Sequence, residues 1–193
     1  MSIFDPSSYK ELRIARTDIP GLLVVALQVN GDSRGWFKEN FQRDKMTALG
    51  IPADFQALQN NVSFNAMRGV TRGIHAEPWD KYISIGYGSA FAAIVDLRPG
   101  QTYGKVLTFS LNPGIALFVP KGCGNAFQTL EDNTVYSYLV NDYWSPDTKY
   151  ISVNIADPSL RIQWPIPLDM SEVSPKDKAN PMLKDVKPME NLE

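Results

Sequence analysis

Histidine and cysteine are almost absent from this sequence of 193 residues, which contains one of each, His75 and Cys123. A single cysteine excludes an internal disulfide and cannot build a thiolate metal site, and it favours a reducing compartment, the cytoplasm. A single histidine means that any imidazole chemistry near neutral pH must use His75. Taken alone, however, one histidine in a predicted strand is better interpreted as a hydrogen-bonded structural residue than as a catalytic base.

Long hydrophobic runs and blocks of positive charge are also lacking. No stretch is long and apolar enough for a membrane span, and residues 1–18 lack the apolar core of a signal peptide. The formal net charge is -2, and no run of Lys and Arg is present that could neutralise a nucleic-acid backbone. The sequence therefore argues against membrane and nucleic-acid partners, although a ligand with one or two phosphates remains compatible with it.

The sequence does contain many short apolar segments separated by Gly, Pro or Asn. These segments predict strands over residues 22–29, 55–64, 69–75, 81–87, 89–97, 105–111, 115–119, 134–140 and 152–155. Aromatic and polar residues alternate over 34–41, which indicates a hairpin, and residues 44–49 predict a short helix. There are no alternating βαβ units and no internal repeat. The pattern predicts an all-β sandwich or barrel with short peripheral helices.

Composition also divides the chain. Residues 1–20 form a polar lead-in, residues 21–183 hold one domain with a sizeable core, and residues 184–193 are a tail or linker. From residue 157 onwards proline becomes frequent and periodicity fades, which predicts an extended C-terminal segment across the body of the domain.

Several separated motifs occur at residues 32–39, 59–63, 69–75, 95–98, 120–122, 142–146, 157–158, 164–165 and 174–177. In this order they resemble the dTDP-4-dehydrorhamnose 3,5-epimerase family, and the resemblance runs from about Gly21 to about Leu183. It is nearest to the epimerase half of bacterial proteins in which a dTDP-4-dehydrorhamnose reductase follows. The Gly-rich nucleotide fingerprint of a reductase is not present in these residues.

The resemblance implies a jelly-roll (cupin) barrel, a homodimer, and a reaction that needs neither a metal nor a cofactor. The implied substrate is a dTDP-4-keto-6-deoxyhexose, and the implied reaction inverts C3 and C5 of dTDP-4-dehydro-6-deoxy-D-glucose to give dTDP-4-dehydro-L-rhamnose. A C–H bond beside a ketone is a very weak acid. The site therefore needs a base, a group that stabilises the enolate oxygen, and an acid on the opposite face of the sugar.

The resemblance also assigns residues to these tasks. His75 is the expected base and Asp177 its partner, Lys81 the expected enolate stabiliser, and Tyr143 the expected acid. The expected substrate-binding residues are Arg34, Glu39, Gln59, Asn61, Arg72, Asn125 and Lys176. Each also has an ordinary interpretation: Lys81 as a solvated strand residue, Asp177 as a helix cap, and Tyr143 as a tyrosine at the barrel edge.

Two departures from the family pattern leave alternatives open. Asn125 stands where the family has a histidine, and Thr148 and Lys149 stand where the family has an acidic residue. Both changes touch sugar contacts, so inversion at C3 alone is an alternative. A metal-dependent cupin would need two or three histidines. A noncatalytic nucleotide-sugar binding domain, which hands substrate to a reductase, is a third interpretation.

Overall fold

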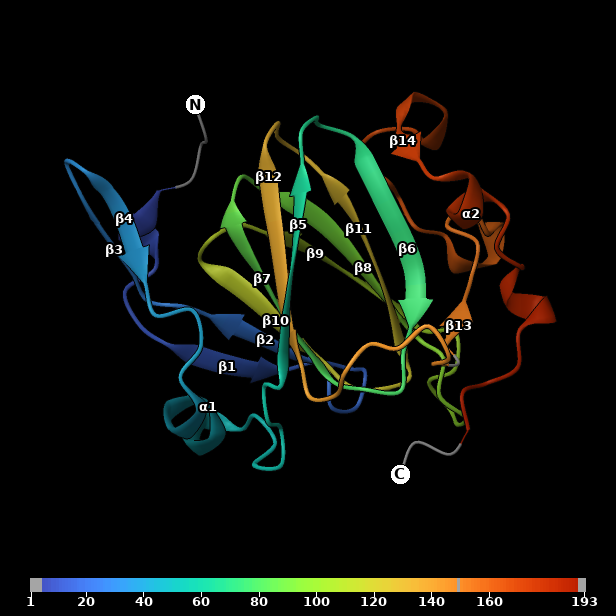
Figure 1. Cartoon of the computed structure of the whole chain (residues 1–193), viewed down its shortest axis with the longest axis horizontal. Helices are drawn as coiled ribbons and strands as arrows, with labels where there is room; N and C mark the ends of the chain where they lie inside the picture. Colours follow the sequence, from blue (N-terminus) through green and yellow to red (C-terminus); the bar gives the residue numbers. More distant parts are fainter. Residues whose placement is uncertain (1–4, 149, 191–193) are drawn as a thin grey trace.

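Two antiparallel sheets face each other in the computed structural model, which describes residues 5–148 and 150–190 (Figure 1). The first sheet has the order β1 (Arg13–Arg16), β2 (Leu23–Ala26), β10 (Ile115–Val119), β7 (Lys81–Tyr87), β12 (Thr134–Val140) and β5 (Gln59–Asn65). The second has the order β13 (Ile151–Ser152), β6 (Val70–Ala76), β11 (Cys123–Thr129), β8 (Ala90–Asp96) and β9 (Val106–Leu111). The short strand β14 (Glu172–Val173) also pairs with β6, in parallel. This is the all-β jelly-roll arrangement that the sequence predicts.

A separate hairpin and a few short helices complete the fold. The hairpin consists of β3 (Val29–Asp32) and β4 (Gly35–Lys38), and Figure 1 shows it projecting from the side of the barrel away from β6. The α-helices are α1 (Arg43–Leu49) and α2 (Pro175–Lys178). Short 3-10 helices are η1 (Pro6–Ser8), η2 (Pro158–Leu160), η3 (Leu168–Met170) and η4 (Leu183–Asp185).

The core lies in three layers, because both sheets are covered on their outer faces. Between the sheets, side chains such as Ile83, Ile94 and Leu117 are fully buried. The outer face of the first sheet packs on α1 through residues that include Met46. The outer face of the second sheet packs on the C-terminal segment, where Val173 is buried.

Most of the predicted strands are present, but the structure corrects several boundaries. The predicted strand over 22–29 is divided between β2 and β3, and the strand expected from residue 55 begins at Gln59. The central strand β11 was not predicted at all. Its Gly124 explains this: a side-chain carbon there would lie 2.6 Å from Ile74 Cγ2, so tight packing requires a residue that favours loops.

Both terminal segments are integrated into the barrel. Strand β1 lies inside the predicted lead-in of residues 1–20 and pairs with β2. The C-terminal segment runs along the second sheet (Figure 1), and the backbone N–H of Met189 donates to the carbonyl oxygen of Leu97 (2.8 Å). Residues of the predicted tail up to 190 therefore pack on the domain, and residues 191–193 lie outside the described residues.

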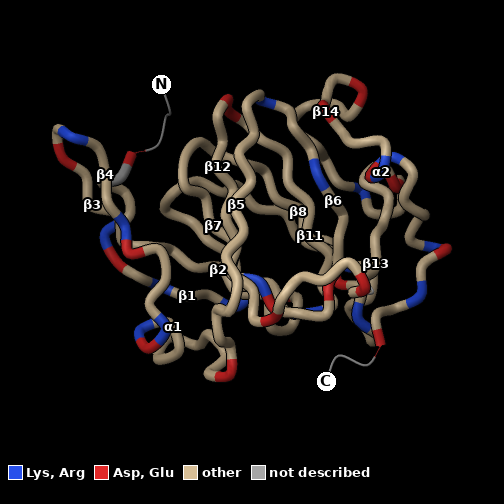
Figure 2. The backbone as a smooth tube through the Cα atoms, in the orientation of Figure 1, with Lys and Arg blue, Asp and Glu red and all other residues tan. Residues whose placement is uncertain are grey.

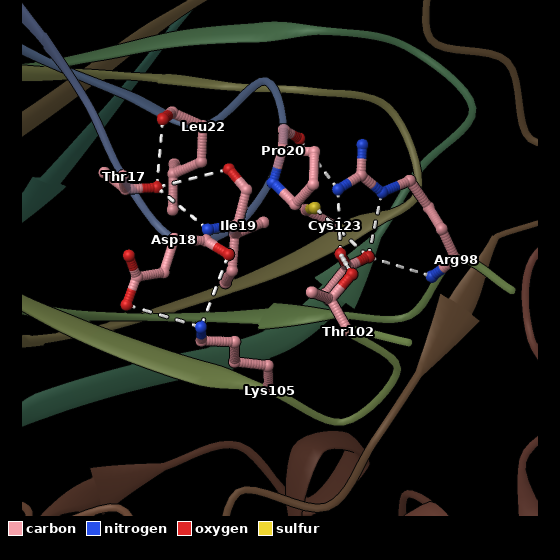
Figure 3. A network of polar contacts seen from close by, with 10 residues as sticks. Thr17, Asp18, Ile19, Pro20, Leu22, Arg98, Thr102, Lys105 and Cys123 are labelled. Atoms are coloured by element: carbon pink, nitrogen blue, oxygen red, sulfur yellow. Dashed lines mark hydrogen bonds and ion pairs between the residues drawn. The ribbon is translucent and has the colours of Figure 1, made fainter. Parts of the chain in front are cut away.

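Charged residues are rare on the barrel strands, as Figure 2 shows: the inner strands β11 and β12 and the edge strand β5 carry none. One exception is Asp96, at the end of β8, which is 1% exposed. Its carboxylate accepts two hydrogen bonds of 2.8 Å from Arg98 and one of 2.8 Å from Thr102. Arg98 also donates to the carbonyl oxygen of Pro20 (2.8 Å), which Figure 3 draws close by. This buried ion pair ties the strand end to the N-terminal segment.

Candidate active site

A cavity of about 310 Å³ opens between the two sheets. Its walls come from β5, β6, β7, β11, β12 and the segment around α2, which are brought together only by the fold. The cavity is lined by Ser63, Arg72, Gly73, His75, Glu77, Lys81, Asn125, Phe127, Tyr136, Tyr138, Ser174, Lys176 and Asp177.

Strand alternation explains why most of these side chains point inward. Successive side chains of a strand face opposite sides, so residues two apart share a face. On β7, Lys81 therefore shares the inner face with the core residue Ile83. On β12, Tyr136 and Tyr138 share that face for the same reason. The inner face of these strands therefore carries polar side chains where it lines the cavity and apolar core side chains elsewhere.

Arg72 and His75 are three residues apart, and a regular strand would send them to opposite faces. A bulge in β6 prevents this: His75 pairs with Asn125 and Arg72 pairs with Phe127, so three steps on β6 match two on β11. Gly73 lies in the bulge with φ of 124°, and a Cβ atom there would lie 2.4 Å from Cβ of Ala126. Only glycine fits, and the bulge turns both polar side chains into the cavity.

His75 is held by Asp177. The distance from Nε2 of His75 to Oδ1 of Asp177 is 2.7 Å, and the Asp177 residue is 4% exposed. The backbone N–H of Gly73 donates to the other carboxylate oxygen (3.3 Å), and Ser174 caps the short helix that carries Asp177. Burial opposes the charged form of Asp177, but the hydrogen bond and charge of His75, with the other donors, lower the pKa of its carboxyl group. The charged carboxylate therefore accepts a hydrogen bond from the N–H at Nε2. Nδ1 is then the ring nitrogen that can accept a proton from the substrate.

Lys81 lies deeper in the cavity and its side chain is 4% exposed. The ammonium group forms an ion pair with Glu77 and donates to Oδ1 of Asn125 (2.5 Å). Lys81 is therefore buried and hydrogen-bonded, and its alternative interpretation as a solvated strand residue is wrong. The ammonium group and the imidazole of His75 line the same cavity, which is the arrangement that enolate chemistry requires.

Tyr143, the expected acid, is not one of the tyrosines that line this cavity. That residue lies in the segment after β12, is 63% exposed and does not line the cavity. Tyr138 on β12 lines it instead and is half-buried. Burial and the nearby Glu77 carboxylate raise the pKa of Tyr138, against a smaller opposing effect of Arg72. A tyrosine that stays protonated across the neutral range is suited to donate a proton.

Comparison with known proteins agrees with this geometry. The family model described as dTDP-4-dehydrorhamnose 3,5-epimerase matches residues 16–185. The chain belongs to this family. The RmlC homolog of Streptococcus pyogenes serotype M6 is 50% identical over 195 residues, which cover 97% of this chain and 96% of that protein. The dTDP-4-dehydrorhamnose 3,5-epimerase of Pseudomonas aeruginosa is 32% identical over 86% of this chain and 93% of its own length.

A solved structure is similarly close. RmlC from Streptococcus suis, determined in complex with dTDP-D-xylose, is 50% identical and superimposes with a TM-score of 0.89 over 93% of this chain and 95% of its own. The family therefore fixes the fold and the class of enzyme, an isomerase, while the residues of this chain fix the details of the cavity.

The site residues that the family resemblance predicted for this chain fall into two groups, those that line the cavity and those that do not. His75, Asp177, Lys81, Arg72, Asn125 and Lys176 line the cavity. Gln59 and Asn61, on the edge strand β5, hydrogen-bond to each other (2.8 Å), and Gln59 also accepts from the backbone N–H of Trp144 (3.1 Å). They do not line the cavity of this single chain.

Arg34 and Glu39 lie farther away, at the projecting hairpin. The Arg34 side chain is 88% exposed and pairs with Asp32 (2.5 Å), while Glu39 pairs with Lys45 (2.8 Å). Arg34 and Glu39 therefore pair with neighbouring residues and not with each other. Neither residue lines the cavity of its own chain.

Sequence reasoning missed two groups in the cavity. Glu77 is two residues after His75, and Tyr136 and Tyr138 are two apart in a predicted strand; this even spacing was the available signal. Within residues 5–148 and 150–190, no group of three or more His, Cys, Asp or Glu side chains is placed to hold a metal ion. Over the same residues, no helix is long and apolar enough to cross a membrane.

Proposed function

We propose that this chain inverts C3 and C5 of dTDP-4-dehydro-6-deoxy-D-glucose to form dTDP-4-dehydro-L-rhamnose, a step of dTDP-L-rhamnose biosynthesis. The observation that carries the proposal is the His75–Asp177 pair in a cavity that also holds Lys81 and Tyr138. The S. suis relative was solved with dTDP-D-xylose, which supports a dTDP-sugar as the ligand class. The P. aeruginosa relative bears the name of this activity.

The reaction begins at the carbon beside the ketone. Nδ1 of His75 removes the proton, the C–H electron pair forms the C=C bond of an enolate, and the carbonyl pair moves to oxygen. Asp177 stabilises the imidazolium that results, and the Lys81 ammonium hydrogen-bonds to the enolate oxygen. A proton returned to the opposite face of the carbon completes the inversion.

Tyr138 is the proposed donor of this second proton, in place of Tyr143. It lies on β12, in the sheet opposite β6, so the two sheets present the base and the acid to one cavity from different sides. Its raised pKa keeps the hydroxyl protonated before transfer. Tyr143, being mostly exposed, has no cavity partner within the described chain.

The proposed assembly is a homodimer in which the β3–β4 hairpin of one copy reaches the cavity of the other. Arg34 and Glu39 match nucleotide-binding positions of the family but lie outside the cavity of their own chain. The base of the hairpin is fixed, because Lys38 donates to the carbonyl oxygens of Ile85 (2.8 Å) and Pro113 (2.9 Å). Beside this base, Phe37 on β4 is 70% exposed, an apolar side chain that a partner would cover.

Mixed dimers test the assembly. Arg34→Ala and His75→Asn variants, each inactive alone, are unfolded together, refolded and assayed. If the hairpin serves the partner, each heterodimer has one intact site, and random pairing restores about a quarter of wild-type activity. If the hairpin serves its own barrel, the mixture stays inactive.

Product analysis tests the reaction itself. The purified chain is incubated with the substrate and a metal chelator, and the ketone is then reduced with borohydride and the sugars are identified. We expect 6-deoxy sugars of L configuration, including L-rhamnose. Sugars inverted only at C3 would instead establish the single-centre alternative, and recovery of unaltered D-configured sugars with detectable binding would indicate the noncatalytic domain. The proposal also places the chain in the cytoplasm, with a carbonyl reductase, fused or separate, to consume the product.

A further inference from the structure

Glu77 is the one acidic side chain of the cavity besides Asp177. It comes directly after β6, two residues beyond His75, so the end of this strand presents a base and a carboxylate to the same space. The Glu77 side chain is 18% exposed, and its carboxylate pairs with the ammonium of Lys81, whose side chain is 4% exposed. The enolate chemistry of the previous section assigns no task to this carboxylate.

The bonds of the Lys81 ammonium group explain what Glu77 does. An ammonium group has three N–H donors. One is directed to Glu77 and one to Oδ1 of Asn125 (2.5 Å), and only a long contact of 3.5 Å joins Nζ to the carbonyl oxygen of His75. The two short bonds fix the direction of the amine, and the third donor remains for a substrate oxygen.

Burial makes the ammonium group of Lys81 depend on protein partners in place of water. A buried charge is stabilised when a partner of opposite charge and good hydrogen bonds replace the water that it has lost. Among the described residues, Glu77 is the carboxylate in direct contact with Lys81. The carboxylate therefore holds the ammonium group in the direction from which it can donate to an enolate oxygen.

We propose that Glu77 is a positioning residue of the epimerase, which holds the amine of Lys81 in place and directed at the ketone oxygen of the sugar. This inference rests on the proposed function and deepens it. No bond to Glu77 forms or breaks in the reaction. The proton leaves carbon for Nδ1 of His75, the enolate oxygen receives a hydrogen bond from Lys81, and Glu77 exchanges no proton with the substrate.

Other titratable groups border the same space and bear on pH dependence. They are Arg72 and His75 on β6, Tyr136 and Tyr138 on β12, and Lys176 and Asp177 in α2. Behind Lys81, Cys123 on β11 has a pKa raised to about 12 by burial, so it is neutral over the working range. Glu77 also raises the pKa of Tyr138, which keeps the proposed acid protonated. Loss of the Glu77 charge therefore removes one of the effects that raise the pKa of Tyr138.

The first test is Glu77→Gln, which keeps the size and one hydrogen-bond acceptor but removes the charge. We expect kcat to fall about tenfold to 100-fold with KM changed by less than about threefold, since the amine is no longer held for the transition state. We also expect the alkaline decline of kcat to move to lower pH, because Glu77 no longer raises the pKa of Tyr138. The matched control is Glu131→Gln, whose carboxylate binds Ser89 outside the cavity and should leave the rate and the pH profile unchanged.

A double-mutant comparison separates positioning from direct chemistry. At neutral pH, where burial keeps the Tyr138 hydroxyl protonated with or without Glu77, Glu77→Gln should cost nothing further in a Lys81→Met background, because its effect on the rate there passes through the amine. This comparison holds even if Glu77→Gln alone is too unstable to purify, since the double variant buries neither charge. A further loss of about tenfold in that background would overturn the inference and make Glu77 a direct participant. An unchanged rate and pH profile in Glu77→Gln would overturn it as well, whereas an inactive wild type would instead overturn the proposed function.

Discussion

Two buried carboxylates, Asp96 and Asp177, are alike in burial but differ in their surroundings. Asp96 is 1% exposed and Asp177 is 4% exposed, and each is paired with a cationic or ionisable partner. The partners of Asp96 are Arg98 and Thr102, and Arg98 also donates to the carbonyl oxygen of Pro20 (Figure 3). This network therefore consists of protein groups that bond to one another. Asp177 instead holds a histidine that lines a cavity of about 310 Å³.

The difference shows that a buried charge identifies a site only when its partner faces open space. A closed network stabilises the fold, because removal of one member leaves another buried charge unpaired. A network that ends at a cavity keeps one group available for a ligand. Substitutions in the two networks should therefore separate stability from activity.

The largest expected effect is that of His75→Asn. The asparagine preserves polarity and a hydrogen bond to Asp177 but cannot accept the substrate proton, so kcat should fall about 10²- to 10⁴-fold. Thermal unfolding should change little. Steady-state kinetics and calorimetry on the same preparation measure both quantities, and a variant that retains wild-type turnover would remove the central residue of the account.

Asp96→Asn should show the reverse behaviour. Loss of the carboxylate leaves Arg98 without its ionic partner, so the free energy of unfolding should fall by about 3 kcal/mol. The folded fraction should keep a kcat within about twofold of wild type, because the network does not line the cavity. Urea unfolding and kinetics measure the two effects. A selective loss of kcat at full stability would show that the comparison is mistaken.

Tyr138→Phe and Tyr143→Phe sharpen the assignment within the cavity. Tyr138→Phe should lower completed inversion about 100-fold while it preserves some exchange of the substrate proton with solvent, since the base remains. Tyr143→Phe, at a mostly exposed residue, should change both by less than about twofold. Product analysis and solvent exchange on each variant distinguish the two. Equal losses of exchange and inversion in Tyr138→Phe would contradict a role on the second face.

The smallest expected effect is the dependence of stability on acid. The pKa of Asp96 is lowered, although burial alone would raise it, because Arg98 and Thr102 bond to the carboxylate. The pKa of Asp177 is lowered likewise. A carboxyl group whose pKa is lower in the folded state stabilises the protein above its unfolded value, about 3.9, and this stabilisation is lost as pH falls through the folded pKa. The stability advantage of wild type over Asp96→Asn should therefore be complete at pH 6 to 7 and shrink below about pH 4. A stability advantage of wild type that grows as the pH falls would contradict the lowered pKa of Asp96 in the folded state.

The sequence predicted much of the fold because strand alternation and turn residues are local signals. It did not predict β11, whose Gly124 is required by contact with Ile74, a residue far away in the chain. Contacts between distant segments leave no local pattern, and the same limit hid the bulge that turns both Arg72 and His75 inward.

The site was predicted in part for the same reason. His75, Lys81 and Asp177 were found through motifs, and the structure brings them to one cavity. The resemblance pointed to Tyr143 and missed Tyr138, because a motif marks a neighbourhood of sequence, whereas only strand pairing decides which tyrosine faces inward. The spacing between Glu77 and Lys81 gave no sign of an ion pair, since a turn separates β6 from β7.

The most direct test of the central claim is proton NMR of dTDP-4-keto-6-deoxyglucose in heavy water with the purified chain. The account predicts that deuterium enters at both C3 and C5 with wild type and at neither carbon above background with His75→Asn. Absence of exchange with wild type, or undiminished exchange with His75→Asn, would contradict it. Exchange at C3 alone would retain the base and reject the double inversion.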